Sequence, residues 1–480
     1  MRPCAKKADF FAANGEVSIR LAEDKGFRQG RKAATTLACT ENTCPVSDVN
    51  PHYLDHVVKL SETSDIEASE DIVSGTGMKL LAKGAKIDAR ARERLLEFRL
   101  DKPLENMMRV VGGTDPALFH PLAEQLLARH ALLRGICASV PGFDPIAILK
   151  ALELSDNVQS LLSVYAGQGA SKLEHAVGVA MVTSALGGSL QANPADTGAL
   201  VVAALTHDIG ELYIDPAFLS RGVKLTAQQW KHVATHPIVG SHVLGAMPGA
   251  GPRIASVVLA HHERMDGFGY PQGTPGSSLS MAGQMLAVAE MLMGLMESGT
   301  HHAQRAAVAM RLVPGEFHRR FIDRVMQGAR TDRDAPDPDP AGFDIASLAT
   351  RVSGLAATIV HVRRHHLELE PQLPKFGAPL RSLIAHAFTR WDRIGIAFSS
   401  TGLDLVADER LHAVLEAMGP SELNEVSIVL RELEWRMSEL ERALQIRSEL
   451  FSPADARHVN DLIDEARQPM LLASMVAAAA

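Results

Sequence analysis

The feature that most constrains the fold is a helical spacing of apolar residues that continues from residue 115 to about residue 330. Apolar side chains recur three and four positions apart in PLAEQLLARHALL, KLEHAVGVAMVTSAL and ADTGALVVAALTHDIG. This spacing places them on one face of an α-helix. Pro145 and Pro194 fit the first turn of a helix, where proline is tolerated. The pattern therefore predicts a helical core.

The flanking sequence divides the chain into five predicted parts. Residues 1–65 are expected to be an irregular extension, and residues 66–112 a small β-plus-helix unit, because EDIVSGTGMKLLAKGAKI places glycines around a short apolar run. Residues 113–330 form the helical core. The Asp- and Pro-rich stretch at 331–344 predicts a linker, and residues 345–480 predict a C-terminal helical domain. The predicted fold class is therefore mainly α, a helical bundle core with a small N-terminal β-containing unit and a C-terminal helical region.

One stretch of the C-terminal region, residues 421–450, has an unusually regular apolar repeat. Residues alternating three and four apart over three heptads are Leu423, Val426, Leu430, Leu433, Met437, Leu440 and Leu444. Such a repeat suits an antiparallel hairpin inside a bundle and also an intermolecular coiled coil. A homodimer through this helix is therefore one of two interpretations.

Composition and charge exclude several classes of protein. The net charge is −8, and lysines and arginines form no long stripe, which argues against nucleic-acid polymers as partners. The four cysteines, Cys4, Cys39, Cys44 and Cys137, are spaced too irregularly for a disulfide framework, so free thiols are expected. The N-terminus has no apolar signal region, and no run approaches the ~20 apolar residues that span a bilayer. We therefore expect a cytoplasmic protein without a membrane partner.

A set of histidines and acids lies on otherwise apolar helices of the core. Its members are His175, His207, Asp208, His236, His261, His262 and Glu290. Each alone has an ordinary explanation, such as a hydrogen-bonded core histidine or a charged helix end. Together they favour metal binding, because an acid in an apolar helix costs several kcal/mol unless it is paired or ligating. Imidazoles with carboxylates suit iron, manganese or zinc, and two such ions can share and activate a water.

Two motifs carry a family resemblance. THDIG, at 206–210, resembles the His-Asp signature of the HD superfamily of metal-dependent phosphohydrolases. HHERMDGFGYP, at 261–271, is similar at every fixed position to the HHExxDGxGYP signature of its HD-GYP branch. The resemblance covers roughly residues 150–300. It implies an all-helical HD core and an enzyme, a phosphoric diester hydrolase, that converts cyclic di-GMP to pGpG or GMP through a hydroxide held by two metals.

The resemblance also implies roles for individual residues. His175, His207 and Asp208 would be metal ligands, with Asp208 bridging to a second ion held by His236, His261 and His262. Glu290 stands where the family usually has an aspartate ligand. Iron or manganese would be the first choice of ion, and zinc, nickel or magnesium the next. Asp208 and Glu211 are the predicted catalytic residues, and the predicted substrate-binding residues are Asp266, Gly267, Gly269, Tyr270 and Pro271.

Several positions depart from the family pattern. Glu211 replaces a lysine that is expected to help neutralise the phosphate, and Gln284 with Met285 replaces an Arg-Ile pair. Ser171 replaces the glutamate of members with three metals, so two ions are expected. These departures leave two alternatives to the enzyme, namely a cyclic di-GMP binding or interaction module and an HD phosphohydrolase for another nucleotide.

Two further groups of histidines are less specific signals. For His361, His365 and His366 we favour a solvated basic helix face over a metal site, because arginines stand between them. For His301 and His302 we expect a surface loop.

Overall fold

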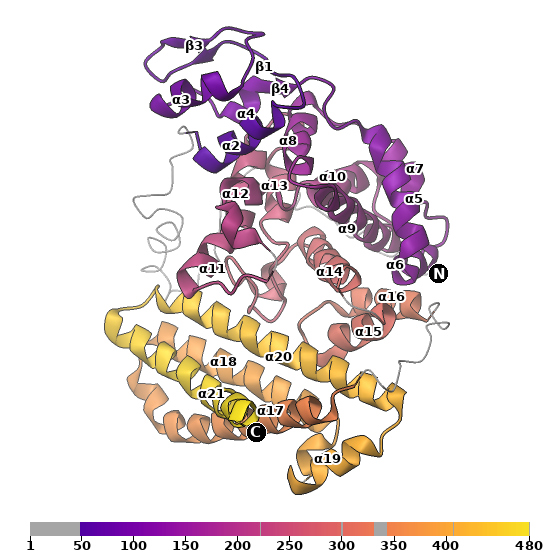
Figure 1. The fold of residues 1–480 in the computed structure, drawn as a ribbon, viewed down its shortest axis with the longest axis vertical. Helices are drawn as coiled ribbons and strands as arrows, with labels where there is room; N and C mark the ends of the chain where they lie inside the picture. Colours follow the sequence, from indigo (N-terminus) through magenta and orange to yellow (C-terminus); the bar gives the residue numbers. More distant parts are fainter. Residues whose placement is uncertain (1–48, 221, 299–300, 331–342, 407, 480) are drawn as a thin grey trace, which may run out of the picture. The chain divides into compact units, whose positions relative to one another are not determined.

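The computed structural model describes residues 49–220, 222–298, 301–330, 343–406 and 408–479 (Figure 1). Among these, residues 49–298 and 317–330 form one compact unit, unit 1, and residues 301–316 and 343–479 form another, unit 2. Most of the predicted linker and three of the four cysteines lie outside the described residues. The remaining cysteine, Cys137, is a buried free thiol, as expected.

Unit 1 begins with a small region of short strands and helices. Its elements are α2 (Pro51–Leu60), β1 (Ile66–Ala68), β2 (Ile72–Val73), β3 (Lys79–Leu81), α3 (Ala89–Glu97), α4 (Leu104–Met107) and β4 (Met108–Val110). β1 pairs with β4, and β2 pairs with β3, both antiparallel. Gly77 and Gly84 adopt the positive φ angles, 87° and 78°, that tight turns require. The predicted β-containing unit is therefore present.

One expectation for this region is wrong. The irregular extension was expected to reach residue 65, but Pro51–Leu60 form the helix α2. The side chain of Asn50 accepts hydrogen bonds from the backbone N–H groups of His52 and Tyr53, and Pro51 occupies the first turn. The side chains of Tyr53 and Leu54, on one face of this helix, are buried. The helix is short, and the burial of its apolar face in unit 1 stabilises it.

The rest of unit 1 is helical, which confirms the predicted mainly α fold class. Its α-helices are α5 (Phe119–Arg129), α6 (Ala131–Ala138), α7 (Pro145–Lys150), α8 (Asp156–Ala166), α9 (Ala170–Ser189), α10 (Pro194–Leu205), α11 (Ala227–Val233), α12 (His236–Gly245), α13 (Pro252–Val258), α14 (Met281–Met296) and α16 (Arg319–Ala329). α9 packs against α10 and α14 at the centre of the unit (Figure 1). α9 and α14 are buried over most of their length, as expected for apolar helices covered on most sides.

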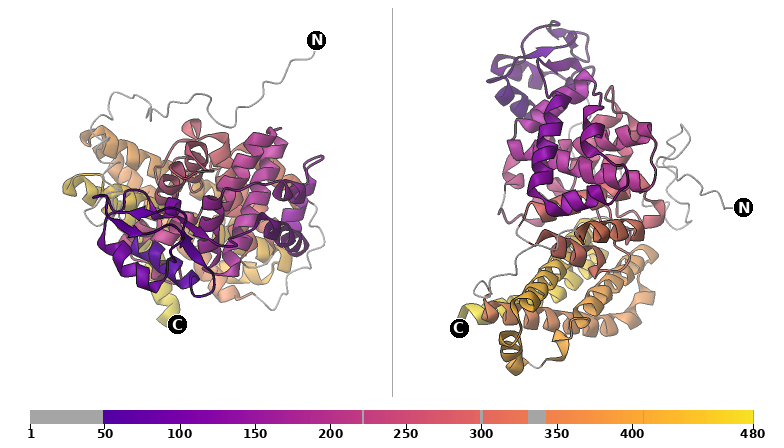
Figure 2. Two further views of the ribbon diagram at one scale, coloured as in Figure 1. Left: turned by 90° about the horizontal axis from the view of Figure 1, so that it is seen from above. Right: turned by 90° about the vertical axis from the view of Figure 1, so that its right-hand side faces the viewer.

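Unit 2 contains α15 (His302–Leu312), α17 (Ile345–Leu369), α18 (Ala378–Ser399), α19 (Asp408–Glu416), α20 (Pro420–Ser448) and α21 (Pro453–Ala479). α17 packs along α21, and α20 packs against α18 and α21 (Figure 2). Residues 301–316, which the sequence pattern assigns to the helical core, belong here instead, because α15 packs on α20.

The heptad repeat of α20 lies inside this bundle. Of its apolar residues, Leu433, Leu440 and Leu444 are fully buried, and Val426 is the most exposed at 9%. Leu430, Leu433 and Met437 belong to the hydrophobic core that α17 and α18 share with α20. The structure therefore supports the intramolecular interpretation, and the repeat is not free to form the seam of a homodimer.

One stretch of unit 2, Ile345–Lys375, is long and apolar enough to cross a membrane by length and composition alone. Within its most apolar window, 39% of the residues are buried inside the protein. Leu348, Val352 and Leu355 of this stretch belong to the core of unit 2. One-sided burial of this kind is typical of an amphipathic helix that packs against a core. A cytoplasmic location and the absence of a membrane partner stay predictions.

A buried network of charges lies in unit 2. The Arg436 guanidinium is fully buried, with Nε 2.9 Å from Glu316 Oε2 and Nη1 3.0 Å from Glu432 Oε2. Its Nη2 also donates to the carbonyl of Ala309 at 2.6 Å. Buried charges are expensive unless they are paired and hydrogen-bonded, and this network satisfies both conditions.

Replacing Arg436 by methionine should lower the free energy of unfolding by about 3–5 kcal/mol, because the buried Glu432 carboxylate loses its guanidinium partner and Glu316 is left with the more distant Arg390, at 3.7 Å. Guanidinium chloride denaturation followed by circular dichroism measures this change. The matched control is Arg364→Met on α17, whose pair with Glu368 is exposed by 67% and 65%. The control should cost less than about 1 kcal/mol. Equal losses for the two variants would contradict the structural role of the network.

Candidate metal centre

The structure brings together all of the predicted metal ligands in the middle of unit 1. They come from α9, from the turn after α10, from the start of α12, from the turn after α13 and from the middle of α14. They are His175, His207, Asp208, His236, His261, His262 and Glu290. Residues separated by more than a hundred positions in the chain therefore meet at one place.

These residues form two groups that share one carboxylate. Site A consists of His175, His207, Asp208 and Glu290, and site B consists of Asp208, His236, His261 and His262. Within each group, one potential ligand atom from each residue lies within 4.8 Å of all the others.

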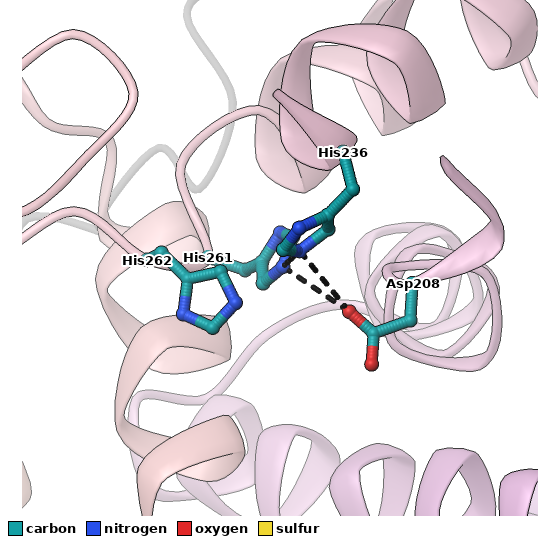
Figure 3. A group of neighbouring side chains, drawn as sticks. All are labelled: Asp208, His236, His261 and His262. Atoms are coloured by element: carbon teal, nitrogen blue, oxygen red, sulfur yellow. Dashed lines mark hydrogen bonds and ion pairs between the residues drawn. The ribbon is translucent and has the colours of Figure 1, made fainter. Parts of the chain in front are cut away.

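The two oxygens of Asp208 face different groups. Its Oδ2 lies 3.2 Å from His207 Nε2 in site A. Its Oδ1 lies 3.4 Å from His236 Nε2 and 3.4 Å from His261 Nε2 in site B (Figure 3). Asp208 is thus placed as a carboxylate that bridges two ions would be.

The ends of three helices orient three of the histidines. Nδ1 of His207 lies 2.8 Å from the carbonyl oxygen of Ala204, three residues earlier. His236 and His261 repeat the arrangement with the carbonyl oxygens of Val233 and Val258, at 2.8 and 2.6 Å. A carbonyl oxygen can only accept, so Nδ1 carries the proton in each ring. Nε2 is then free to bind a metal, which is how outer partners of metal-binding histidines act.

His175 has a different outer partner. Its Nδ1 lies 2.8 Å from Glu297 Oε1, while its Nε2 lies 2.9 Å from Glu290 Oε2 on the inner side. A carboxylate behind a histidine raises the basicity of the ring and holds its orientation. Glu297 was not among the predicted site residues. It follows Glu290 by seven positions, two helical turns, so its place on the same face was a usable signal.

The acids of the site are ionised. Burial raises the pKa of Asp208, but His207, His236 and His261 outweigh burial and lower it well below its usual range. For Glu290, His175 and His207 likewise overcome burial and lower the pKa. Burial lowers the pKa of His207, but the charges of Asp208 and Glu290 outweigh that effect and raise it to about 10. The two carboxylates therefore favour a positive charge beside them.

Two histidines of site B are neutral. Burial lowers the pKa of His261 to about 4, in spite of Asp208, and the charges of His236 and His207 act in the same direction as burial. Burial, together with His261 and His236, also lowers the pKa of His262. A neutral imidazole is the form that binds a metal.

These contacts fit two divalent ions. His236 Nε2 and His261 Nε2 lie 2.9 Å apart, and both rings already carry their protons on Nδ1. Two neutral rings would point lone pairs at each other, so this contact needs a positive charge. Burial lowers the pKa of His236, but Asp208 and Glu211 outweigh burial and raise it, so a proton on His236 can supply that charge. A metal cation between the rings and Asp208 would take the place of this proton. Imidazole nitrogens with bridging carboxylates suit iron, manganese, zinc or nickel.

The HHERMDGFGYP segment builds one wall of the site. After His261 and His262, the buried Glu263 carboxylate accepts hydrogen bonds from the backbone N–H groups of Gln272, Gly273 and Thr274, at 2.7, 3.1 and 2.9 Å. Glu263 therefore holds the two ends of the loop together, which is a structural role for the acid of this motif.

The predicted substrate residues of the loop have structural roles. Asp266 Oδ1 accepts from the N–H of Phe268 at 3.1 Å, and Gly267 has a φ of 77°. A Cβ at Gly269 would lie 2.4 Å from the carbonyl oxygen of His262, so only glycine fits there. The Tyr270 ring stacks on His262 with centroids 4.5 Å apart. Substrate contact by these residues and by Pro271 stays a prediction.

The positions that depart from the family pattern have specific neighbours. Glu211 forms an ion pair with Lys172 of α9, a residue that was not predicted. Lys172 precedes His175 by three positions, so it lies on the same side of the helix one turn earlier. Gln284 is buried, and its Nε2 donates to the carbonyl of Leu279 at 2.9 Å, which secures the start of α14. A catalytic role for Glu211 stays a prediction.

The other histidines that the sequence singles out are not part of this centre. His361 Nε2 lies 2.6 Å from Glu465 Oε2, and His366 stacks on Phe388 with centroids 4.0 Å apart. They support packing within unit 2 rather than a fully solvated face. The expectation of a loop at His302 is wrong, because this residue begins α15.

The close approach between the turn after α10 and the start of α12 depends on Gly210. A Cβ at this position would lie 2.1 Å from the carbonyl oxygen of His236. The glycine of THDIG therefore lets the backbone that carries Asp208 approach the backbone that carries His236. This approach brings Asp208, which belongs to both sites, next to His236 of site B.

Gly210→Ala should force these backbones apart, lowering both the bound metal per chain and the stability, the latter by about 1–3 kcal/mol. Elemental analysis and thermal unfolding measure the two effects. Gly198→Ala on α10 is the matched control, because a Cβ there meets no atom within 4 Å. The control should keep its metal and gain up to about 1 kcal/mol. A metal-replete Gly210→Ala protein of normal stability would contradict this argument.

Glu297→Gln should weaken metal binding at site A by about 10–100-fold, because His175 loses its carboxylate partner. A metal titration of the full chain gives the affinity. Glu174→Gln, on the same helix as His175, removes a carboxylate that pairs instead with Arg129 at 2.9 Å. It should leave the affinity unchanged. Unchanged affinity in Glu297→Gln as well would show that Glu297 does not act through His175.

The sequence of this part of the chain is similar to that of known proteins. The family model described as HD domain matches residues 156–321. The 3'3'-cGAMP-specific phosphodiesterase 3 of Vibrio cholerae is 26% identical over 243 residues, which are 47% of this chain and 53% of that protein. The cyclic di-GMP phosphodiesterase PA4108 of Pseudomonas aeruginosa is 32% identical over 117 residues, 24% of this chain and 28% of that protein.

A third relative is the cyclic di-GMP phosphodiesterase PdeB of Borreliella burgdorferi, 30% identical over 115 residues, with 24% of this chain and 30% of that protein covered. The chain thus spans about half the length, or less, of these curated relatives. The matches confirm the resemblance that the THDIG and HHERMDGFGYP motifs indicate. Residues 156–321 of this chain match the HD domain family, and relatives that share this part of the sequence are named as cyclic di-GMP or 3'3'-cGAMP phosphodiesterases.

Proposed function

We propose that this protein is a metal-dependent phosphodiesterase that hydrolyses cyclic dinucleotides, with cyclic di-GMP as its substrate and pGpG or GMP as product. The observation that carries the proposal is the position of Asp208, whose two oxygens face two separate groups of imidazoles. Two-ion sites of this kind are suited to displacement at phosphorus.

The relatives support the same class of substrate. The proteins from Pseudomonas and Borreliella are named as cyclic di-GMP phosphodiesterases, and the Vibrio protein as specific for 3'3'-cGAMP. Each of these substrates contains at least one guanine base. The proposal places the protein in bacterial cyclic-dinucleotide signalling, in the cytoplasm.

The side chains of the centre would hold the two metal ions and orient the imidazole rings that bind them. Site A and site B each offer imidazole nitrogens and the shared Asp208 carboxylate to one divalent ion, with iron or manganese as our first choice. When bound, such a pair lowers the pKa of a water and stabilises negative charge on a phosphate. Backbone carbonyls already hold the rings of His207, His236 and His261 in place, so these rings need not reorient when a metal binds. Burial of the ligands excludes bulk water, which strengthens the electrostatic interactions of the site.

The test is turnover of a panel of cyclic dinucleotides by the full chain supplied with iron or manganese, with products separated by chromatography. His207→Ala and Asp208→Ala should each reduce turnover by more than about 100-fold, because loss of a mere outer partner of a ligand already costs about 10–100-fold. His242→Ala, an exposed histidine of α12, is the matched control and should retain turnover.

Turnover unaffected by both ligand variants would contradict the proposed mechanism. Tight binding of cyclic di-GMP without turnover in the wild type would support the alternative of a binding module. Turnover confined to a different nucleotide would correct the substrate.

A further inference from the structure

A cavity of about 170 Å³ lies beside site A, and nothing in the proposed chemistry uses it. Its walls are the side chains of His56, Tyr165, Gln168, Lys172, Glu211, Leu212, Pro216, Leu219 and Ser220. Pockets that enclose a whole drug-sized ligand usually measure about 300–1,000 Å³. This cavity therefore suits one part of a dinucleotide rather than all of it.

The cavity is tied to the metal centre through two of its walls. Lys172 lies one turn before His175 on α9. Glu211 follows Asp208 by three positions, and its backbone N–H donates to the Asp208 carbonyl oxygen at 2.9 Å. A ligand whose phosphate is held at the metal centre could therefore place a neighbouring group in the cavity.

The charges of the cavity argue against a phosphate as its occupant. Lys172 and Glu211 form an ion pair, so the positive charge is already compensated. A phosphate placed there would meet the Glu211 carboxylate, and like charges at close range are strongly unfavourable in a partly buried site. A neutral group with both donors and acceptors would instead match the pair.

The hydrogen-bonding groups of the cavity fit the edge of a nucleobase. A carboxylate has about four lone-pair sites and an ammonium has three donors. After the ion pair forms, Glu211 can therefore still accept hydrogen bonds and Lys172 can still donate them. Lys172 is 33% and Glu211 17% exposed in their side chains, so a ligand can reach both. The Tyr165 hydroxyl, in a residue that is only 1% exposed, has no hydrogen-bond partner among the described residues. Leu212, Pro216 and Leu219 add apolar surface for a flat ring.

Resting on the proposed function, we infer that this cavity binds one guanine base of the cyclic dinucleotide. Glu211 accepts hydrogen bonds from the N1–H and the 2-amino group of guanine, and Lys172 donates to its O6. Adenine presents an acceptor at N1 and a donor at C6, which is the wrong order for this pair. Enzymes that read a base in a pocket commonly do so through its Watson–Crick edge.

Binding of three hydrolysis-resistant phosphorothioate analogues to the full chain tests the inference. The analogues correspond to cyclic di-GMP, to cyclic di-IMP, which lacks only the 2-amino groups, and to cyclic di-AMP. Calorimetry should show the guanine analogue binding about 10–100-fold more tightly than the inosine analogue, because a hydrogen bond to a charged group is lost. This comparison needs no variant, so it does not depend on how a substitution folds.

Two variants test whether Lys172 and Glu211 cause the preference for guanine. Glu211→Gln should reduce the preference for guanine over inosine to within about threefold, because the amide cannot accept both N–H groups. Lys172→Met should weaken the guanine and inosine analogues alike by about tenfold, because both carry O6, and should leave the adenine analogue unchanged. Glu174→Gln, whose carboxylate pairs with Arg129 outside the cavity, is the matched control and should change none of the affinities.

The outcomes separate this inference from the proposed function. Equal affinity of the wild type for the guanine and inosine analogues would overturn base recognition and leave the phosphodiesterase proposal standing. Equal weakening of all three analogues by Lys172→Met would show a phosphate contact and overturn the inference. If the wild type bound none of the analogues and hydrolysed no cyclic dinucleotide, the proposed function itself would fail.

Discussion

The structure of unit 1 depends on one buried carboxylate, that of Asp208. A charge taken out of water is tolerated only where other groups compensate it, and Asp208 is compensated on both of its oxygens. Each compensating imidazole comes from a different turn or helix end. The requirement to surround this one acid therefore specifies how the turn after α10, the start of α12 and the turn after α13 are arranged.

Three of the candidate ligand histidines, His207, His236 and His261, lie next to helix ends for a physical reason. The last carbonyl groups of a helix have no intrahelical partner. In this protein Ala204, Val233 and Val258 stand in the last turns of α10, α11 and α13, and each carbonyl binds Nδ1 of the histidine three residues later. Each of these contacts uses a carbonyl at a helix end and aims Nε2 of the histidine at the centre. His175 lies within a helix, where its neighbouring carbonyls are occupied, and it uses the Glu297 carboxylate instead.

The glutamate at position 211, where the family pattern has a lysine, is balanced by a residue that only the tertiary structure brings close. Taken alone, a glutamate near a phosphate site suggests weakened substrate binding. In the structure Lys172 pairs with it, so the local charge is balanced rather than negative. The pair also changes what this side of the centre can recognise, because a balanced pair suits a neutral base edge better than an anion. In the proposed site, the candidate metal ligands and the pair that would select the substrate are therefore separate groups of residues.

Much of this protein is determined by its sequence. The apolar spacing predicted the helices, and Pro145 and Pro194 stand in the first turns of helices as expected. The two motifs, together with the other histidines and the acid on apolar helices, identified the residues that gather around Asp208. These features are local, because a helix, a cap and a tight turn each depend on residues a few positions apart. The short α2 was missed because its stability comes from burial against the rest of unit 1.

Tertiary structure alone decided what the local pattern left open. The heptad repeat of α20 is compatible with a partner inside or outside the chain, and only the packing of α17 and α18 shows that it is covered within unit 2. Lys172 is an ordinary surface residue by its sequence context, and its meeting with Glu211 depends on the folding of α9 against the turn after α10. Contacts between residues far apart in the chain follow from how helices pack as whole bodies. Helical periodicity does not encode that packing, because it specifies which face of a helix is buried and not which partner covers it.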